Sequence, residues 1–306
     1  MRLVFAGTPE VAVMSLNALV ESAHEVVAVV TRPDAPSGRG RSLRPSPVAA
    51  RAQELGLETL KPAKPSDPDF VARLTELAPD CCPVVAYGAL VPQKVLDIPT
   101  HGWVNLHFSL LPRWRGAAPV QHAVMAGDPE TGAVTFQLVK AMDAGPVYGS
   151  ITTPIEPDTT SGDLLDQLAV DGAQLLVETI DQLGGGTATA VPQPEQGITV
   201  APKITTDDAR LDWNRTAVEL DRQVRGCHPA PGAWALFRGE RFKINSARPI
   251  EGAAPVGQLE ITKKTVAVGT GQGLLELDNI QPPGKKAMRA ADWARGVQFT
   301  EGEALS

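Results

Sequence analysis

The chain has 306 residues, which at about 150 residues per domain points to two domains. Hydrophobic residues make up 43% of the chain and charged residues 21%, a globular composition that excludes a disordered chain or a coiled coil. The formal net charge of −7 at pH 7 excludes a uniformly basic nucleic-acid coat, although residues 32–44 hold four arginines against one aspartate.

The sequence shows no membrane, secretion or disulfide signal. No apolar run approaches the roughly 20 residues of a membrane span, and the opening MRLVFAGTPE lacks the apolar stretch of a signal peptide. We therefore expect a cytoplasmic protein that is not bound to a membrane. Cys81, Cys82 and Cys227 make no disulfide framework, and neither CxxC nor HExxH occurs, so we expect reduced, buried cysteines and no metal.

The first half of the chain alternates between short apolar runs and helical patterns. Thr8 with Pro9, and Ser46 with Pro47, predict helix starts, because a capping hydroxyl followed by proline suits the first turn. Strands are predicted at residues 2–7, 26–31, 83–87, 103–107 and 133–140. This alternation predicts an α/β fold with a mostly parallel sheet, in which the residues after each strand line the active site.

The second half of the chain changes character. Thr160 and Asp163 resemble a capping box that opens a long amphipathic helix, and three glycines end this helix at 184–186. Glycine-separated apolar runs follow a short helix near 216–225 and predict a small antiparallel sheet or barrel. We therefore divide the chain into a catalytic domain (1–186), a linker (187–205) and a C-terminal domain (206–306).

Three polar residues mark a candidate catalytic site. Asn105 and His107 lie two apart on a predicted strand, so their side chains share one face. An amide donor beside an imidazole can stabilise an oxyanion, and an imidazole can move a proton near neutral pH. Asp143 follows the strand predicted at 133–140, and in a parallel sheet it would reach the same carboxyl edge and orient the imidazole.

Each of these residues also has a simpler interpretation. His107 taken alone is explained as a hydrogen-bonded core histidine, and Asp143 as a solvated turn residue before Gly145. Gly7 ends the first strand, but neither GxGxxG nor a P-loop occurs, so no dinucleotide or ATP site is predicted. Three polar groups at one sheet edge favour the catalytic interpretation.

The segment NLHFSLLPRWRGAAP at 105–119, with MDAG downstream, closely resembles the methionyl-tRNA formyltransferase family. The resemblance covers nearly the whole chain and includes FAGTPE, TRPDAPSGRG, VVAYG, PGAW and PPGKKAM. The SLLPRWRGAAP block is highly specific, whereas the Asn-x-His…Asp constellation is shared with other folate-dependent formyltransferases. The resemblance implies a Rossmann-like formyltransferase domain followed by an OB-like β-barrel domain, and we expect a monomer.

The resemblance also implies an activity. The family transfers a formyl group from 10-formyltetrahydrofolate to the α-amino group of the methionine on initiator tRNA, without a metal. Asn105 and protonated His107 would bind the oxyanion, and Asp143 would support His107 and help to remove the proton of the amine. Folate and tetrahydrofolate would lie against Ser109, Leu110, Leu111, Pro112, Tyr87 and Gly88.

The basic segment 32–44 gains a role from the resemblance, because the matching loop of the family grips the tRNA acceptor arm. The predicted tRNA contacts are Arg39, Arg41, Arg44, Lys203, Lys285 and Lys286. A loop rich in glycine, proline and arginine suits phosphate contacts, although without the resemblance a solvated surface loop is the simpler interpretation. Phe108 departs from the family pattern, where a small residue is usual, and we expect it to change packing only.

Two other functions remain open. A formyltransferase that acts on a sugar-nucleotide amine shares the two-domain layout, whereas one that acts on a purine precursor usually lacks the C-terminal domain. RWRGAAP, Arg39 and PPGKKAM favour the tRNA enzyme. The other function is a non-catalytic folate- or tRNA-binding module, against which the intact Asn105, His107 and Asp143 argue.

Overall fold

The computed structural model describes residues 1–37 and 42–306, so Arg39 and Arg41 lie outside the described residues. The described chain forms two compact units, each assembled from separate stretches of sequence. The first unit comprises Met1–Gly116, Thr131–Thr153 and Leu165–Val200. The second comprises Ala117–Glu130, Pro154–Leu164 and Ala201–Ser306.

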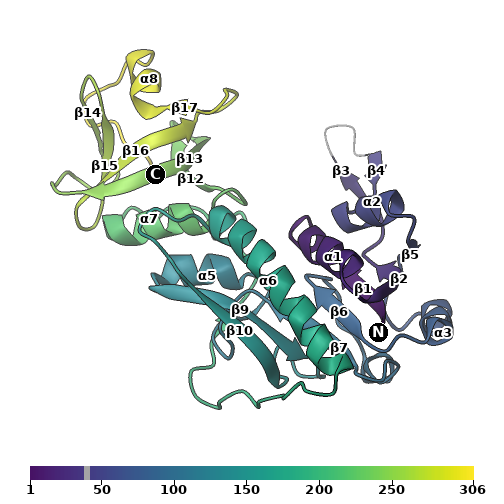
Figure 1. The fold of residues 1–306 in the computed structure, drawn as a ribbon. Helices are drawn as coiled ribbons and strands as arrows, with labels where there is room; N and C mark the ends of the chain where they lie inside the picture. The colour runs from purple at the N-terminus through teal and green to yellow at the C-terminus, as the bar shows by residue number, and fades with distance from the viewer. Residues whose placement is uncertain (38–41) are drawn as a thin grey trace. The chain divides into compact units, whose positions relative to one another are not determined.

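A seven-stranded sheet forms the centre of the first unit, with strand order β10-β9-β7-β6-β1-β2-β5 (Figure 1). The four pairings from β5 to β7 are all parallel, which confirms the mostly parallel α/β fold. The apolar, β-branched sequences of these parallel strands suit strands that are covered on both faces. The strands are β1 (Arg2–Gly7), β2 (Glu25–Val30), β5 (Glu58–Leu60), β6 (Cys82–Val85), β7 (Trp103–His107), β9 (Glu130–Gln137) and β10 (Val147–Pro154).

Two sets of helices flank this sheet. One face carries a core in which Phe70 and Leu74 of α3 (Pro68–Leu77) pack with Trp103 of β7. On the opposite face of β7, Leu106 lies against Gly172 of α6 (Ser161–Gly184), where an added Cβ would stand 3.0 Å from Leu106 Cδ2. The remaining helices are α1 (Val11–Glu21), α2 (Pro47–Glu54) and α4 (Gln93–Leu96).

The helix starts test the capping predictions. Ser46 caps α2 by accepting a hydrogen bond from Ala49 N at 3.0 Å, as predicted. Thr160 and Asp163 exchange the predicted reciprocal bonds at the start of α6, each at 3.2 Å. The prediction at Thr8 is wrong, because α1 begins at Val11 and the Thr8 hydroxyl instead donates to the carbonyl of a neighbouring strand end.

The strand predicted at 133–140 differs from β9 in extent and direction. β9 ends at Gln137 and pairs antiparallel with β7, with Val104 opposite Gln137 and His107 opposite Val134. The carboxyl ends of β7 and β9 therefore lie at opposite edges of the sheet. The reasoning that Asp143 reaches His107 because the two strands are parallel is wrong, and it is the turn after β9 that brings Asp143 within electrostatic range of His107.

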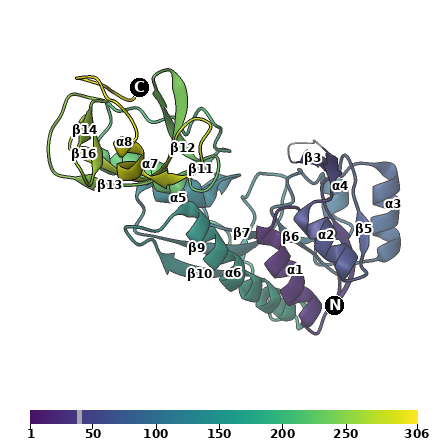
Figure 2. The same ribbon diagram turned by 90° about the horizontal axis from the view of Figure 1, so that it is seen from above.

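The second unit contains the predicted antiparallel sheet, with order β12-β13-β16-β15-β14 and β17 beside β16 (Figures 1 and 2). Two register shifts in β13 curl the sheet into a half-barrel, which confirms the OB-like class. In its core Phe237 packs edge to face on Trp293, and Phe242 packs against both rings at a tilted angle. The strands are β12 (Ala233–Phe237), β13 (Glu240–Ile250), β14 (Leu259–Ile261), β15 (Val266–Gly269), β16 (Leu274–Gln281) and β17 (Met288–Arg289).

Three helices complete the second unit, α5 (Pro119–Ala126), α7 (Ala217–Gly226) and α8 (Ala290–Arg295). A capping box between Thr216 and Glu219 fixes the start of α7, where the sequence predicts a short helix. Four two- and three-residue strands lie elsewhere, β3 (Ala35–Ser37), β4 (Ser42–Arg44), β8 (Arg115–Gly116) and β11 (Val200–Ala201).

Candidate active site

Strand β7 presents Asn105 and His107 on the face of the sheet that also carries Trp103. The alternation of a strand turns Leu106 to the opposite face, where it packs on α6. His107 is only 6% exposed, whereas Asn105 is half-buried. The two side chains therefore lie next to each other, as the sequence predicts, with the amide nearer to solvent.

One hydrogen bond fixes the imidazole of His107. Its Nε2 nitrogen lies 2.9 Å from the main-chain oxygen of Trp114. A carbonyl oxygen only accepts, so Nε2 carries the proton and Nδ1 holds the lone pair of the neutral ring. The ring of Phe136 lies edge-on at 6.2 Å between centroids and limits how the imidazole can turn.

The surroundings of His107 act on its pKa in opposite directions. Burial is the largest effect and lowers the pKa of the imidazole below 6.5, because the charged ring loses its hydration. The negative charge of Asp143 and the carbonyl of Trp114 both raise this pKa, without reversing the effect of burial. The folded chain therefore holds His107 neutral at pH 7, ready to accept a proton.

Asp143 lies on the turn between β9 and β10 with a left-handed backbone, φ +48°. Its Oδ2 oxygen accepts a hydrogen bond from Gly116 N at 2.8 Å. Gly116 has φ +128°, a region that favours glycine. The segment 105–119 and the Asp143 turn therefore meet at a residue that suits this backbone. Trp114 and Gly116 are site residues that the sequence reasoning did not identify, although both lie in the block RWRGAAP.

The predicted folate residues fall into two groups. Ser109 is fully buried and its hydroxyl donates to Arg113 O at 2.7 Å, which closes a turn that carries three half-buried residues, Leu110, Leu111 and Pro112. This turn follows His107 directly.

Tyr87 and Gly88 occupy a different position. The ring of Tyr87 packs in the core beside α3, and its carbonyl accepts the Thr8 hydroxyl at 2.8 Å. Gly88 follows with φ +80°, and its Cα faces the aliphatic part of Arg32. Only the main chain of these two residues is therefore open to a ligand at this strand end.

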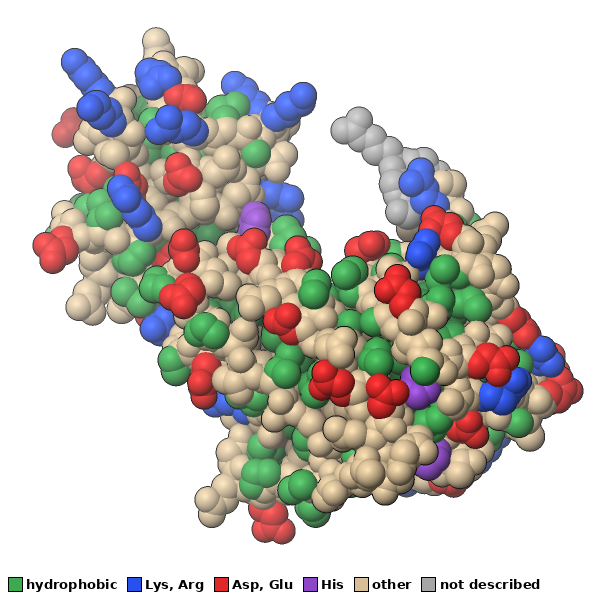
Figure 3. Space-filling model, viewed as in Figure 1, with side chains coloured by type: hydrophobic (Ala, Val, Ile, Leu, Met, Phe, Trp, Pro, Cys, Tyr) green, Lys and Arg blue, Asp and Glu red, His purple; other side chains and the backbone are tan. Residues whose placement is uncertain are grey.

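The predicted tRNA contacts that the structure describes are all exposed. Arg44 ends β4 in the first unit, and Lys203, Lys285 and Lys286 lie in the second. Lys285 N donates to Pro282 O at 3.1 Å, so the two neighbouring lysines project from a turn. Figure 3 shows further Lys and Arg side chains on the face of the second unit that is in view.

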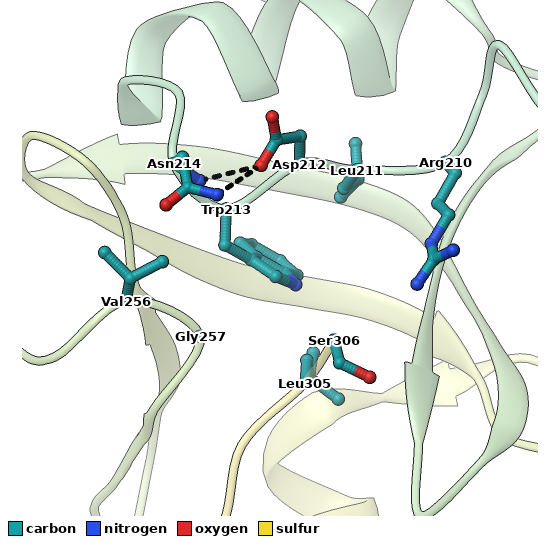
Figure 4. A pocket seen from close by; sticks show the side chains of 9 residues that line it. All are labelled: Arg210, Leu211, Asp212, Trp213, Asn214, Val256, Gly257, Leu305 and Ser306. Atoms are coloured by element: carbon teal, nitrogen blue, oxygen red, sulfur yellow. Dashed lines mark hydrogen bonds between the residues drawn. The ribbon is translucent and has the colours of Figure 1, made fainter.

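A cavity of about 360 Å³ lies in the second unit and holds none of the predicted site residues (Figure 4). Asp212 is its only carboxylate side chain, and one oxygen of that carboxylate already accepts both the main-chain N and the amide of Asn214. Within residues 1–37 and 42–306, no three His, Cys, Asp or Glu side chains are grouped as a metal site requires. No helix in this described part is long and apolar enough to span a bilayer.

Comparison with known proteins places the chain in a class. A family model described as formyl transferase matches residues 1–180, and one described as formyl transferase, C-terminal domain, matches residues 203–298. The fold is shared with an N-formyltransferase from Helicobacter canadensis, which was solved in complex with folinic acid and dTDP-3-aminofucose. That structure has a TM-score of 0.69 and 16% identity, over 90% of this chain and 97% of that one. The fold and the matched models define a formyl transferase.

Relatives with much higher identity narrow this class. A methionyl-tRNA formyltransferase of Streptomyces coelicolor is 62% identical over 306 residues, which cover 99% of either chain. Another from Thermobifida fusca is 61% identical over 305 residues, 99% of this chain and 98% of the relative. The chain belongs to the methionyl-tRNA formyltransferase family.

Proposed function

We propose that this enzyme transfers a formyl group from 10-formyltetrahydrofolate to the α-amino group of the methionine on initiator tRNA, with Asn105, His107 and Asp143 as its catalytic residues. The observation that carries the assignment of these residues is the buried imidazole of His107. One of its nitrogens is committed to a main-chain carbonyl, and a carboxylate on a neighbouring turn is near enough to influence its pKa. Identity above 60% along the full chain supports the choice of acceptor.

His107 acts first as a base in this mechanism. The neutral amine of the methionine attacks the formyl carbon, and a bond forms between nitrogen and carbon while the carbonyl electrons move to oxygen. The nitrogen of the adduct is positive and acidic, so it loses its proton to the lone pair of Nδ1 on His107. The imidazole becomes charged only at this step, which suits a ring that burial holds neutral beforehand.

The oxyanion then faces two donors. The Asn105 amide and the newly charged His107 both donate to it, and the negative charge of Asp143 stabilises the imidazolium. Collapse of the adduct breaks the bond between the formyl carbon and the folate nitrogen, which leaves with the proton that Nδ1 of His107 took up, so the ring returns to its neutral form. The protonated imidazole that the sequence analysis expects thus arises during the reaction, because the folded chain starts with the neutral ring.

The binding of both substrates follows from the same placement. The folate cosubstrate lies against the turn 109–112 and the main chain of Tyr87 and Gly88, next to the catalytic strand. The tRNA is held by Arg39, Arg41, Arg44, Lys203, Lys285 and Lys286, of which the four described are exposed. Residues 206–306 act as a tRNA-binding domain after the catalytic domain and linker. The enzyme works as a monomer in the cytoplasm.

A sugar-nucleotide amine is the competing acceptor. The Helicobacter canadensis enzyme, solved with a dTDP-amino sugar, has the same fold. At 16% identity, however, it supports only the architecture, whereas the relatives above 60% are methionyl-tRNA formyltransferases along their whole length. A binding module without activity is disfavoured by the intact catalytic trio.

The decisive experiment measures formyl transfer from 10-formyltetrahydrofolate to Met-tRNA, with initiator and elongator tRNA side by side. The wild-type chain should formylate the initiator selectively, and His107→Ala should bind folate but turn over at least about 10²-fold more slowly. Transfer to a dTDP-amino sugar and none to tRNA would move the enzyme to the sugar class. Folate binding without any transfer would leave the binding module as the better account.

A further inference from the structure

The linker is a structured part of the first unit along residues 191–199. Val191 pairs with Val147 of β10 through two main-chain hydrogen bonds of 2.8 Å. At its other end the Thr199 carbonyl accepts from Arg115 N at 2.9 Å. The segment thus connects the strand after the Asp143 turn to the chain that follows His107.

Gln193 of this segment forms hydrogen bonds with both the nitrogen and the oxygen of its side-chain amide. Its Nε2 donates to the carbonyl oxygens of Asp143 and Gly145, each at 2.8 Å. Its Oε1 accepts from Arg115, from Nε at 3.1 Å and from Nη2 at 2.6 Å. One half-buried side chain therefore ties the Asp143 turn to the residue before Gly116, whose N–H holds the Asp143 carboxylate.

Thr199 is linked to the other catalytic side chain, His107, through the main chain of Trp114. Its hydroxyl oxygen accepts from Trp114 N at 2.8 Å, and the carbonyl of the same Trp114 accepts from Nε2 of His107. Trp114 has φ +62°, a left-handed backbone that is unfavourable for a bulky residue and persists only when neighbours hold it. Thr199 is such a neighbour.

We propose that Gln193 and Thr199 are positioning residues for formyl transfer, which hold the Asp143 turn and the Trp114 carbonyl so that the aspartate and the histidine keep their relative placement. Neither residue needs to touch a substrate. The proposal rests on the proposed function, and it gives the linker a part in catalysis as well as in connecting two domains. Gln193 acts on the aspartate side and Thr199 on the histidine side.

The test compares four variants of the two residues, and one control variant, with the wild-type full-length chain. Gln193→Leu removes every bond of the amide, whereas Gln193→Glu keeps an acceptor for Arg115 and loses both donors to the Asp143 turn. Thr199→Val removes the hydroxyl at constant shape, and Thr199→Ser restores it. Gln196→Leu is the matched control, because it makes the same chemical change at an exposed residue of the same segment.

The expected result is a loss of kcat with little change in the KM of either substrate. We expect kcat to fall about 10²-fold in Gln193→Leu and Gln193→Glu and about 10-fold in Thr199→Val, and to recover in Thr199→Ser. If the Asp143 turn moves away, the pKa of His107 falls further, so the acid limb of the kcat/KM profile shifts to lower pH in the Gln193 variants. Titration of the His107 ring by NMR reports the same shift without any turnover.

The remaining outcomes separate a failure of the positioning roles from a failure of the proposed function. If kcat in the Gln193 and Thr199 variants matches Gln196→Leu, or if only the KM for tRNA rises, the two residues do not position the site. If Gln193→Leu does not fold, the NMR titration of Gln193→Glu decides, and an unshifted His107 in that variant overturns the role of Gln193. The role of Thr199 is decided by kcat, and Thr199→Val with the same kcat as Thr199→Ser overturns it. If the wild-type chain transfers no formyl group, the proposed function fails, whereas the titration still tests the placement of His107.

Discussion

Nε2 of His107 donates a hydrogen bond to the main-chain oxygen of Trp114 at an N–O distance of 2.9 Å, so the ring can offer only Nδ1 to a substrate. The bond runs to a residue in the block that follows the strand, which couples the histidine to the conformation of that block. Replacement of the Trp114 side chain leaves this carbonyl in place. The imidazole is therefore oriented by the backbone, and its tautomer is set before any substrate arrives.

Burial of His107 predicts a loss of stability in mild acid. Its pKa is below 6.5 in the folded chain, so the unfolded chain binds a proton that the folded chain does not. Above pH 6.5 both states hold the neutral ring, so His107 does not lower the free energy of unfolding there. As pH falls below 6.5, protonation of the unfolded chain lowers the free energy of unfolding. Urea unfolding of His107→Gln should show a smaller decline below pH 6.5 than the wild-type chain shows.

His24 provides an internal comparison for that experiment, because burial lowers its pKa too, with the nearby N-terminal charge adding to the effect. His24→Gln should also reduce the fall in the free energy of unfolding below pH 6.5, and the double variant should reduce it more than either single variant. A decline as steep in His107→Gln as in the wild-type chain would contradict the burial effect proposed for this ring.

Asp143→Asn separates the charge of the aspartate from its geometry. The amide oxygen can still accept from Gly116 N, so the turn should keep its place while the negative charge is lost. Without that charge the pKa of His107 falls further and the imidazolium formed in the reaction loses its support. We expect kcat to fall about 10²-fold or more, with the acid limb of kcat/KM at lower pH.

Asp143→Ala is the control for this prediction, since it removes the hydrogen bond as well. It should be at least as impaired and less stable, because Gly116 N loses its acceptor. Wild-type kcat in Asp143→Asn would show that the charge has no part in the reaction.

The contact between Leu106 and Gly172 predicts that the helix face of β7 is sensitive to volume. A Cβ at residue 172 would stand 3.0 Å from Leu106 Cδ2, and the further methyl groups of valine would come closer. Gly172→Val should lower the free energy of unfolding by about 1–3 kcal/mol, as overpacking does. Gln174→Val, at an exposed residue of the same helix, should change it by less than about 1 kcal/mol, and a Gly172→Val as stable as this control would refute the contact.

Local signals predict much of the fold because each depends on few neighbours. Ser46 with Pro47 and Thr160 with Asp163 satisfy helix-terminal N–H groups within three residues, and both caps are present. Thr8 looks equally suited, but a carbonyl from another strand end competes for its hydroxyl. Capping patterns thus fail where a partner distant in sequence offers a better bond.

In the candidate site, too, local patterns are predicted correctly and contacts between distant residues are not. Asn105 and His107 are placed by the two-residue period of one strand, which the sequence contains in full. Asp143 depends on the direction of β9, and an apolar run does not reveal whether its strand pairs parallel or antiparallel. Gln193 lies 50 residues from Asp143 in a stretch without periodicity, and only its two bonds to the turn show its role.

The paired lysines of the second unit predict a salt-dependent interaction with tRNA. Lys285 and Lys286 are exposed on one turn, where neutralised phosphates would release counterions on binding. Lys285→Ala with Lys286→Ala should weaken binding of initiator Met-tRNA and reduce the slope of log Kd against log salt by about 1–2, whereas folate binding should not change.

Lys263 and Lys264 supply the matched control, because they are another exposed pair of lysines in the same unit that the family resemblance does not implicate. Their double alanine variant has the same net charge as the test variant, so a general loss of positive charge would weaken both equally. Equal slopes in the two variants would mean that the enzyme attracts tRNA by overall charge and makes no phosphate contact at Lys285 or Lys286. A smaller slope in the Lys285 and Lys286 variant alone would place the contact there.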